Sequence, residues 1–228
     1  MKRPFLFVAL DGTEGHIIKM ASTLSRVDGN FGFKVTLDYL LHVEKGLKVT
    51  VGNIQQYEKP VFIDLKMWNG TRTMLEVIKT LVGLGVDYLN VYALADYLLP
   101  KAIEMTKNSN TKVLGLTVLS HYGDAYCKRH FNRTFESSVD HFARIAIEAG
   151  CHGVILPGTM LHVIDELKSI KVATGIRPNW YEDTRHKQEI TPKEAVKNGA
   201  DALVCGSPIL KSADCIDALK KVLSEMRI

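Results

Sequence analysis

The 228-residue chain has no apolar run long enough to cross a membrane. A spanning helix needs about 18 consecutive apolar residues, whereas the first apolar stretch, Phe5–Leu10, stops at Asp11. The basic pair Lys2-Arg3 before this stretch is similar to the start of a signal peptide, but no small-residue cleavage site follows it. We therefore interpret Phe5–Leu10 as a buried strand and expect a cytoplasmic protein that does not bind membranes.

Sequence motifs for metals and for nucleotide-binding glycine loops are also missing. The four cysteines form no C-x-x-C pair, and the eight histidines form no H-E-x-x-H motif. Neither G-x-G-x-x-G nor the glycine loop of nucleoside triphosphatases is present. We expect reduced thiols and no metal site.

The chain has little excess of either charge. Its 29 basic and 25 acidic residues give a net charge of +4. The basic residues cluster tightly only at Lys128–His130 and Arg185–Lys187, and aromatic residues are not interleaved with them as in a nucleic-acid stacking surface. We expect no nucleic-acid partner and interpret both clusters as solvated loops, with anion binding as the alternative.

Short apolar runs recur along the whole chain and predict eight β-strands. The runs are mostly continuous rather than alternating, which is typical of parallel strands buried on both faces. The predicted strands are Phe5–Leu10, Phe31–Leu37, Val61–Leu65, Tyr88–Tyr92, Val113–Leu119, Gly153–Leu156, Val172–Ile176 and Ala202–Cys205.

The segments between the strands carry helical signals. Apolar residues recur at helical spacing in 14–27, 73–85, 135–150 and 214–226, and Thr191-Pro192-Lys193-Glu194 has the form of a capping box. A glycine stands shortly before three of the strands, in Gly85-Val86-Asp87, Gly150-Cys151-His152 and Gly199-Ala200-Asp201. Eight strand–helix units of about 28 residues favour a closed barrel over a doubly wound sheet. The sequence therefore predicts an α/β fold, a single (β/α)8 TIM barrel, as one domain over residues 1–228.

Charged residues stand where several predicted strands end, which is the active-site face of such a barrel. Asp64 and Lys66 lie two residues apart on one predicted strand, so both side chains should point into the barrel, with Lys34 on the neighbouring strand. A buried cluster of charges is costly and is typical of a functional site. The alternative is that these charges only neutralise one another in the barrel core.

Glycines after the last two predicted strands form a second candidate feature. Gly175 and Gly206 could expose backbone N–H groups to a phosphate, as in many barrels of this kind, or could simply be turn residues. Together with the charge cluster, this feature predicts a small phosphorylated substrate at the barrel mouth.

Five elements in order along the chain resemble the orotidine 5′-monophosphate decarboxylase family. They are Ala9-Leu10-Asp11, Phe33-Lys34-Val35, Phe62-Ile63-Asp64-Leu65-Lys66, Gly175-Ile176-Arg177-Pro178 and Thr191-Pro192. The resemblance covers nearly the whole chain, and its specific motif is Asp-x-Lys-x-x-Asp, which begins at Asp64. It implies the decarboxylation of orotidine 5′-monophosphate to uridine 5′-monophosphate in pyrimidine biosynthesis, by a homodimer that uses no metal or cofactor.

The resemblance also implies roles for individual residues. Asp11 and Lys34 would contact the ribose and the charge network, Asp64 would crowd the substrate carboxylate, Lys66 would donate the proton, and Ser120 would contact the pyrimidine edge. The catalytic set would be Lys34, Asp64, Lys66 and Asn69, and the substrate-binding set Asp11, Thr73, Ser120, Pro178, His186, Gln188, Gly206 and Ser207.

The sequence departs from the family pattern at three places. Asn69 replaces the last aspartate of the motif, Ser207 replaces an arginine that grips phosphate, and His186 aligns with a phosphate-loop glutamine, for which Gln188 could substitute. Asparagine cannot supply negative charge, and serine cannot make a charged bidentate contact to phosphate. Two alternatives therefore stay open: a related lyase for another phosphorylated or carboxylated molecule, or a nucleotide-binding relative without catalysis.

Overall fold

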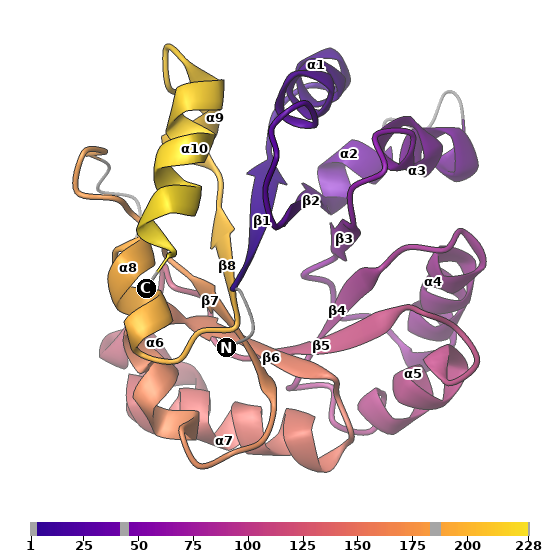
Figure 1. Cartoon of the computed structure of the whole chain (residues 1–228). Helices are drawn as coiled ribbons and strands as arrows, with labels where there is room; N and C mark the ends of the chain where they lie inside the picture. The colour runs from indigo at the N-terminus through magenta and orange to yellow at the C-terminus, as the bar shows by residue number, and fades with distance from the viewer. Residues whose placement is uncertain (1–3, 42–45, 183–187, 228) are drawn as a thin grey trace.

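Eight parallel strands close into a barrel in which each strand pairs with the next along the chain and β8 pairs with β1 (Figure 1). The computed structural model describes residues 4–41, 46–182 and 188–227. The strands are β1 Phe5–Leu10, β2 Phe31–Thr36, β3 Val61–Asp64, β4 Tyr88–Tyr92, β5 Lys112–Leu116, β6 Gly153–Pro157, β7 Ile170–Thr174 and β8 Ala202–Cys205. The predicted TIM barrel is confirmed, and each of its strands overlaps a predicted run.

Five strands end at residues other than the predicted ones. β2 ends at Thr36 rather than Leu37, and β6 ends at Pro157 rather than Leu156. β3 ends at Asp64 rather than Leu65, and β5 ends at Leu116 rather than Leu119. β7 begins two residues earlier than predicted and also ends two residues earlier. It ends before Gly175, whose φ of 77° an extended strand does not allow. Apolar runs continue past these ends because the first residues of the following loops still pack inward.

Helices surround the barrel on the outside (Figure 1). The helices that sequence periodicity predicts are present, with ends one to three residues from the predicted ones. Among the shorter helices, the sequence predicted the start of α8 from its capping box, whereas the others were not predicted because four to nine residues carry little periodicity. The helices are α1 Glu14–Leu24, α2 Leu37–Leu41, α3 Leu47–Gln55, α4 Thr71–Gly83, α5 Leu99–Thr106, α6 Asp124–Phe131, α7 Phe135–Glu148, α8 Pro192–Lys197, α9 Ser207–Leu210, α10 Cys215–Glu225 and the 3-10 helix η2 Gly158–Ile164.

The capping box that the sequence predicts at Thr191 is confirmed at the start of α8. The Thr191 hydroxyl accepts a hydrogen bond from the Glu194 N–H at 3.2 Å, and the Glu194 carboxylate accepts one from the Thr191 N–H at 3.2 Å. Among the helices of the described residues, none has both the length and the apolar character needed to span a membrane. All four cysteines are free thiols.

The three glycine joints share one hydrogen-bonding device. Gly85, Gly150 and Gly199 all have φ between 69° and 89°, which turns each chain from a helix into the next strand. The residue two positions later then accepts from the first or second N–H of the preceding strand: the Asp87 carboxylate accepts from Val61 at 2.7 Å and the Asp201 carboxylate from Lys171 at 2.9 Å. At the third joint, the His152 imidazole accepts from Val113 at 3.1 Å.

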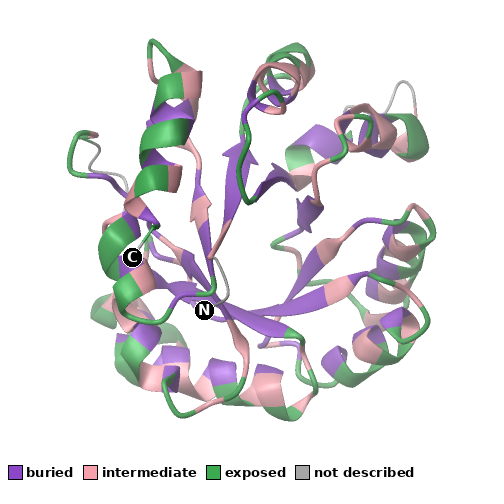
Figure 2. Cartoon of the chain, in the orientation of Figure 1, coloured by how far each residue is buried: buried purple, intermediate pink, exposed green. Residues whose placement is uncertain are grey.

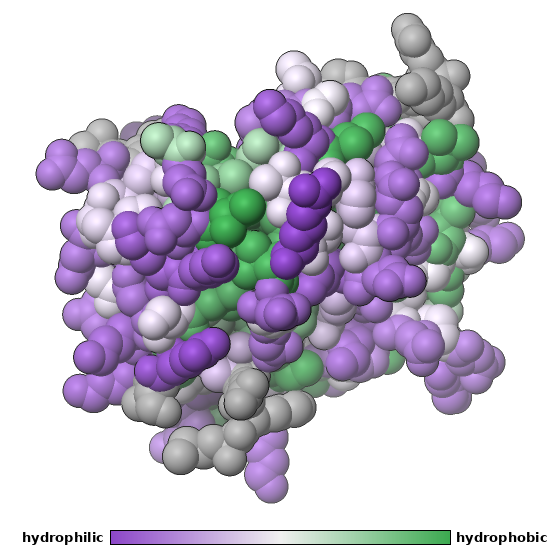
Figure 3. Space-filling model, turned by 45° about the horizontal axis from the view of Figure 1, so that its top comes forward, coloured by the Kyte–Doolittle hydropathy of each residue, from purple (hydrophilic) through white to green (hydrophobic). Residues whose placement is uncertain are grey.

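Apolar residues form two cores, one between strands and helices and one inside the barrel (Figure 2). The inner core contains edge-to-face aromatic contacts, with ring centroids 5.2 Å apart for Phe7 and Phe62 and 5.0 Å apart for Phe7 and Tyr88. These rings close the barrel below the carboxyl ends of the strands. On the outside, hydrophilic residues cover most of the face in Figure 3, and hydrophobic residues gather in a central recess.

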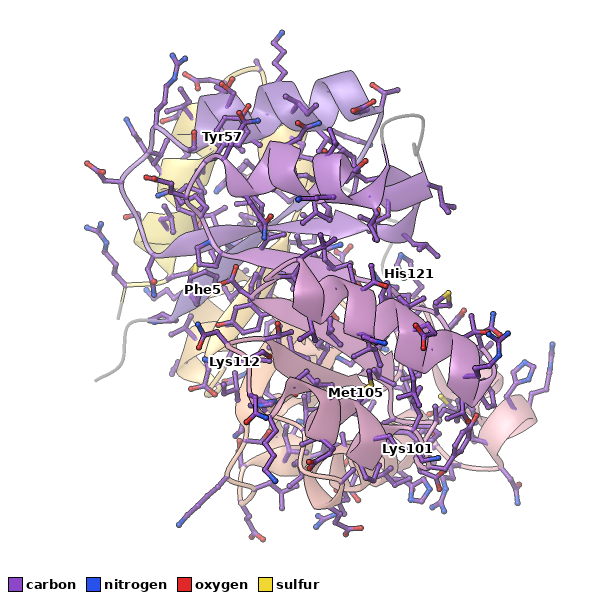
Figure 4. The ribbon with its side chains drawn as sticks, turned by 90° about the vertical axis from the view of Figure 1, so that its right-hand side faces the viewer. Phe5, Tyr57, Lys101, Met105, Lys112 and His121 are labelled. Atoms are coloured by element: carbon purple, nitrogen blue, oxygen red, sulfur yellow. The ribbon has the colours of Figure 1, made fainter. Side chains whose placement is uncertain are left out.

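The two ends of the barrel lie on opposite sides of the molecule in Figure 4. Phe5 and Lys112, at the starts of β1 and β5, lie on one side, and His121, beyond the end of β5, lies on the other. The side of His121 is therefore the carboxyl-terminal face, where barrels of this kind carry their chemistry.

Candidate active site

A cavity of about 230 Å³ opens at the carboxyl-terminal ends of the strands. Its walls are mainly the inward-facing positions of the strands and the first residues of the loops that follow. The predicted site residues that line this cavity are Asp11, Lys34, Asp64, Lys66, Ser120, Gly206 and Ser207. The cavity is also lined by residues that sequence reasoning did not select, among them Thr36, Phe62, His121, Thr174 and Arg177.

Two lysines share one carboxylate oxygen at the floor of this cavity. Lys34 Nζ lies 2.8 Å from Asp64 Oδ2, and the Lys66 ammonium forms an ion pair with the same oxygen. Lys34 and Asp64 are buried, with side-chain exposures of 6% and 5%. We call these three residues the charge cluster. The structure brings together the charges that the sequence predicts, on adjacent strands β2 and β3.

The route by which Lys66 reaches Asp64 differs from the predicted one. β3 ends at Asp64, and Lys66 adopts a left-handed backbone with φ of 40°. The prediction that both side chains point inward from one strand is therefore wrong in its reason, although the ion pair is present. A left-handed residue directly beyond the strand turns the Lys66 side chain back over the strand end.

The prediction that the charges at the barrel mouth are buried together is correct only for Lys34 and Asp64. Asp11 is exposed, and the Lys66 side chain retains 38% of its accessible surface. Both residues follow the last residues of their strands, so they stand at the rim of the cavity, whereas Lys34 and Asp64 lie within the strands. The desolvation cost falls mainly on one ion pair, between Lys34 and Asp64.

Asn90 on β4 completes the coordination of Asp64 and was not selected from the sequence. Its side-chain NH₂ donates to Asp64 Oδ1 at 2.6 Å, and its oxygen accepts from the Leu65 and Lys66 N–H groups at 2.9 and 3.3 Å. Asn90 is only 1% exposed. A buried amide in the apolar run Tyr88–Tyr92 is the signal that could have identified it.

The electrostatics of the charge cluster keep Asp64 ionised. Burial alone would raise the pKa of Asp64, but the Lys34 and Lys66 ammonium groups outweigh burial and lower it from 3.8 to about 2. The pKa of Lys66 lies below its ordinary value because of partial desolvation and the nearby Lys34 ammonium, with Asp64 acting in the opposite direction. The cluster therefore presents a lysine that gives up its proton more readily than a lysine in water.

The opposite wall of the cavity contains the Arg177 guanidinium and the start of α9. Arg177 is 8% exposed, its Nη1 donates to the Ile176 carbonyl at 2.8 Å, and its Nε lies 3.9 Å from the Glu189 carboxylate. Gly206 and Ser207 line the cavity at the start of α9. The signal that could have identified Arg177 is its position directly after the predicted strand Val172–Ile176, in the Gly-Ile-Arg-Pro element.

Other predicted site residues lie outside the lining of this cavity. Asn69 is exposed, and its side-chain oxygen accepts from the Gly70 N–H. Thr73 is half-buried in α4, and Pro178 is buried beyond Arg177. The Gln188 oxygen accepts from the Thr159 hydroxyl at 2.8 Å. His186 lies outside the described residues.

The described residues contain no group of three or more histidine, cysteine, aspartate or glutamate side chains arranged to hold a metal ion. The chemistry that the cavity can supply comes from its charges. It offers one buried carboxylate, two ammonium groups and one guanidinium around a space suited to a small anionic molecule.

A family model described as "Orotidine 5'-phosphate decarboxylase / HUMPS family" matches residues 4–222. The orotidine 5'-phosphate decarboxylase of Methylacidiphilum infernorum is 33% identical over 171 residues, which are 73% of this chain and 74% of the relative. That of Streptococcus pneumoniae (strain Hungary19A-6) is 28% identical over 223 residues, 96% of this chain and 94% of the relative. The solved orotidine 5'-phosphate decarboxylase of Lactobacillus acidophilus shares the fold, with a TM-score of 0.82 and 24% identity over 99% of this chain and 100% of that one.

The ionised Asp64 should make a pH-dependent contribution to folding stability. Its folded pKa of about 2 is below the ordinary value of 3.8, so the contribution is complete above about pH 4 and is lost as the pH falls toward 2. We expect this contribution to be on the order of 2 kcal/mol. Denaturant unfolding of the wild type and Asp64→Asn should therefore give a gap in unfolding free energy that narrows between pH 4 and pH 2.

Asp140→Asn provides the control, because Asp140 pairs with Arg144 at 2.8 Å on the surface of α7. An exposed pair of this kind contributes no more than about 0.5 kcal/mol. A gap for Asp64→Asn that stays constant from pH 4 to pH 2 would contradict the ionised, lysine-paired state of Asp64.

Proposed function

The chain belongs to the orotidine 5'-phosphate decarboxylase / HUMPS family, and we propose that it converts orotidine 5′-monophosphate to uridine 5′-monophosphate, with Lys66 as the proton donor. The observation that carries this proposal is the charge cluster at the floor of the cavity, in which Lys34 and Lys66 share one oxygen of Asp64. The product would serve pyrimidine biosynthesis.

Loss of carbon dioxide from an sp2 ring carbon leaves an electron pair with little resonance stabilisation. An ammonium group at that carbon stabilises the developing charge and then donates a proton to it. In the proposed reaction the C–C bond breaks, its electrons stay on the ring carbon, and the Lys66 proton forms the new C–H bond. Electrons and charge balance without a metal or a cofactor.

Asp64 would have two roles in this reaction. Its ionised carboxylate keeps the Lys66 ammonium oriented, since both groups are in direct contact. In the bound complex it would also face the substrate carboxylate, and the repulsion between them would be relieved as carbon dioxide leaves. Asp64 stays charged at neutral pH despite its burial, because the Lys34 and Lys66 ammonium groups outweigh desolvation and lower its pKa to about 2.

The substrate phosphate would occupy the opposite wall of the cavity. Arg177 supplies a positive charge there, and Gly206 and Ser207 supply the start of α9. Ser120 and Asp11 line the cavity between this wall and the charge cluster and would contact the pyrimidine and the ribose. Energy from binding the remote phosphate would hold the base against Lys66.

We further propose that the protein is a homodimer with Asn69 at the interface. Asn69 is exposed on its own subunit, and the adjacent Trp68 is 56% exposed. Tyr97, in the loop after β4, is 48% exposed. Both loops follow strand ends on the face that carries the cavity, so a second copy docked on these rings would bring residue 69 near its partner's cavity.

Lys66→Ala should abolish the decarboxylation of orotidine 5′-monophosphate. Loss of a proton donor costs a rate factor of about 100 to 10,000, and loss of the ammonium removes charge stabilisation as well. The assay follows the decrease of orotidylate absorbance with purified protein. Lys101→Ala in α5, on the exterior of the barrel, should retain wild-type turnover (Figure 4).

The same assay, together with a binding measurement for uridine 5′-monophosphate, separates the three candidate functions. Turnover by the wild type but not by Lys66→Ala supports the proposal. Wild-type protein that binds uridine 5′-monophosphate without turning over orotidylate would indicate a nucleotide-binding relative. Neither binding nor turnover would indicate a lyase for a different substrate.

Arg177→Ala should weaken binding of the phosphorylated nucleotide selectively. A hydrogen bond to a charged group contributes about 1.5–3 kcal/mol, so the Kd of uridine 5′-monophosphate should rise by at least about tenfold. The Kd of uridine, which lacks the phosphate, should change little. Isothermal titration of both ligands measures the difference, and equal losses for the two ligands would place the phosphate elsewhere.

Sedimentation velocity should give a dimer for the wild type and a monomer for Trp68→Glu, because a charge at the centre of an apolar contact opposes association. Trp180→Glu is the control, since Trp180 is another exposed tryptophan, at 41%, but its indole N–H donates to Glu225 of α10 at 2.8 Å. A dimer that persists in Trp68→Glu, or a monomeric wild type, would contradict the proposed interface.

A further inference from the structure

We propose that Asn90 is a positioning residue that orients Asp64 and Lys66 for the reaction, an inference that rests on the proposed function. Asn90 does not line the cavity and would not touch the substrate. Its effect would be exerted through one hydrogen bond to the Asp64 side chain and two from the backbone N–H groups of Leu65 and Lys66. Asp64 and Lys66 line the cavity.

The donor side of Asn90 fixes the rotation of the Asp64 carboxylate. Rotation about the bond to a carboxylate is only weakly restricted by the side chain itself. The 2.6 Å hydrogen bond from Asn90 Nδ2 occupies Oδ1, so Oδ2 is left to face both ammonium groups. Without this donor the carboxylate could turn, and the shared contact of Lys34 and Lys66 would be lost.

The acceptor side of Asn90 supports the bend that presents Lys66. Lys66 has a left-handed backbone, which is unfavourable for residues other than glycine. The Asn90 oxygen receives the N–H groups of both Leu65 and Lys66, directly beyond the end of β3. One side chain thus holds the carboxylate and the start of the loop in a fixed relation.

The chemical nature of Asn90 fits a positioning role and does not fit simple packing in the apolar core. A polar amide at a site that is 1% exposed, one layer above Phe62 and Tyr88, is costly unless its hydrogen bonds are made. Aspartate would lack the donor and add negative charge, and leucine would fill the space without either contact. Asparagine gives a donor and an acceptor in one plane without changing the charge of the cluster.

Two substitutions separate positioning from packing. Asn90→Leu removes both hydrogen-bonding functions at similar volume, and kcat for orotidylate should fall about 100-fold, the order expected for a displacement near 1 Å. KM should change much less, because Asn90 does not contact the substrate. The matched control is Thr111→Val before β5, which removes another buried hydrogen bond, to the Val86 carbonyl at 2.6 Å, at the opposite end of the barrel. It should destabilise the fold but leave kcat unchanged.

Asn90→Asp supplies a rescue that a purely structural role does not predict. At neutral pH its carboxylate keeps the acceptor but cannot donate to Asp64, and kcat should be low. The charged and titratable groups around it are Asp64 at the end of β3, Lys66 beyond that end, Lys34 on β2 and Tyr92 on its own strand. Two facing carboxylates share a proton more readily than either alone, so the donor returns as the pH falls. The ratio of variant to wild-type kcat should rise toward low pH.

A second readout does not depend on the substrate. Lysine labelled with 13C at Cε reports the titration of Lys66, assigned by its absence in Lys66→Ala. In Asn90→Leu the misaligned Asp64 carboxylate supports the ammonium less, so Lys66 should titrate at lower pH than in the wild type, and in Thr111→Val it should not change. The titration of Lys66 can be measured even if the wild type does not decarboxylate orotidylate. Such a lack of turnover would overturn only the proposed function. An unchanged Lys66 titration in Asn90→Leu, or a variant-to-wild-type kcat ratio that is constant with pH in Asn90→Asp, overturns the proposal for Asn90.

Discussion

Two ammonium groups in contact with one carboxylate oxygen set the conditions that the rest of the cavity has to meet. Lys34 and Lys66 repel each other, and only Asp64 between them makes their proximity favourable. Because Lys34 and Asp64 are buried, water cannot compensate for a misplaced charge. The barrel meets this condition by placing Lys34 and Asp64 inside neighbouring strands, where the backbone ladder fixes their separation.

The layers below and beside the cluster make this arrangement stable. The barrel beneath it is filled by edge-to-face contacts among Phe7, Phe62 and Tyr88, so the charges lie on an apolar floor. The low dielectric of this floor strengthens the attraction between the lysines and Asp64. Asn90 is the polar group at this depth that bonds directly to Asp64. The same β4 strand therefore contributes to the apolar floor through Tyr88 and to the hydrogen-bonded wall through Asn90.

The sequence predicted those parts of the structure that depend on local patterns. Continuous apolar runs located the strands, and the glycines at 85, 150 and 199 located the joints, because both signals arise within a few residues. The motif around Asp64 predicted the charge cluster. The left-handed backbone of Lys66 and the contacts of Asn90 were not predictable in the same way, since residues 66 and 90 are brought together by the register of β3 with β4. Every site residue that the family resemblance implies was expected at the cavity. Asn69 and Thr73 nevertheless lie outside its lining on the same subunit.

The neutral side chain at position 69 has a consequence for the acidity of Lys66. The charge cluster by itself carries two positive charges and one negative charge. If the proposed dimer brings residue 69 of one subunit near the other's cluster, an aspartate there would neutralise the cluster and stabilise the Lys66 ammonium. Asn69 can contribute hydrogen bonds but no such charge. The cluster then stays net positive, which favours an anionic substrate and leaves the pKa of Lys66 lowered by desolvation and by its neighbour Lys34. A more acidic ammonium transfers its proton more readily, so the loss of one carboxylate from the motif is compatible with proton donation by Lys66.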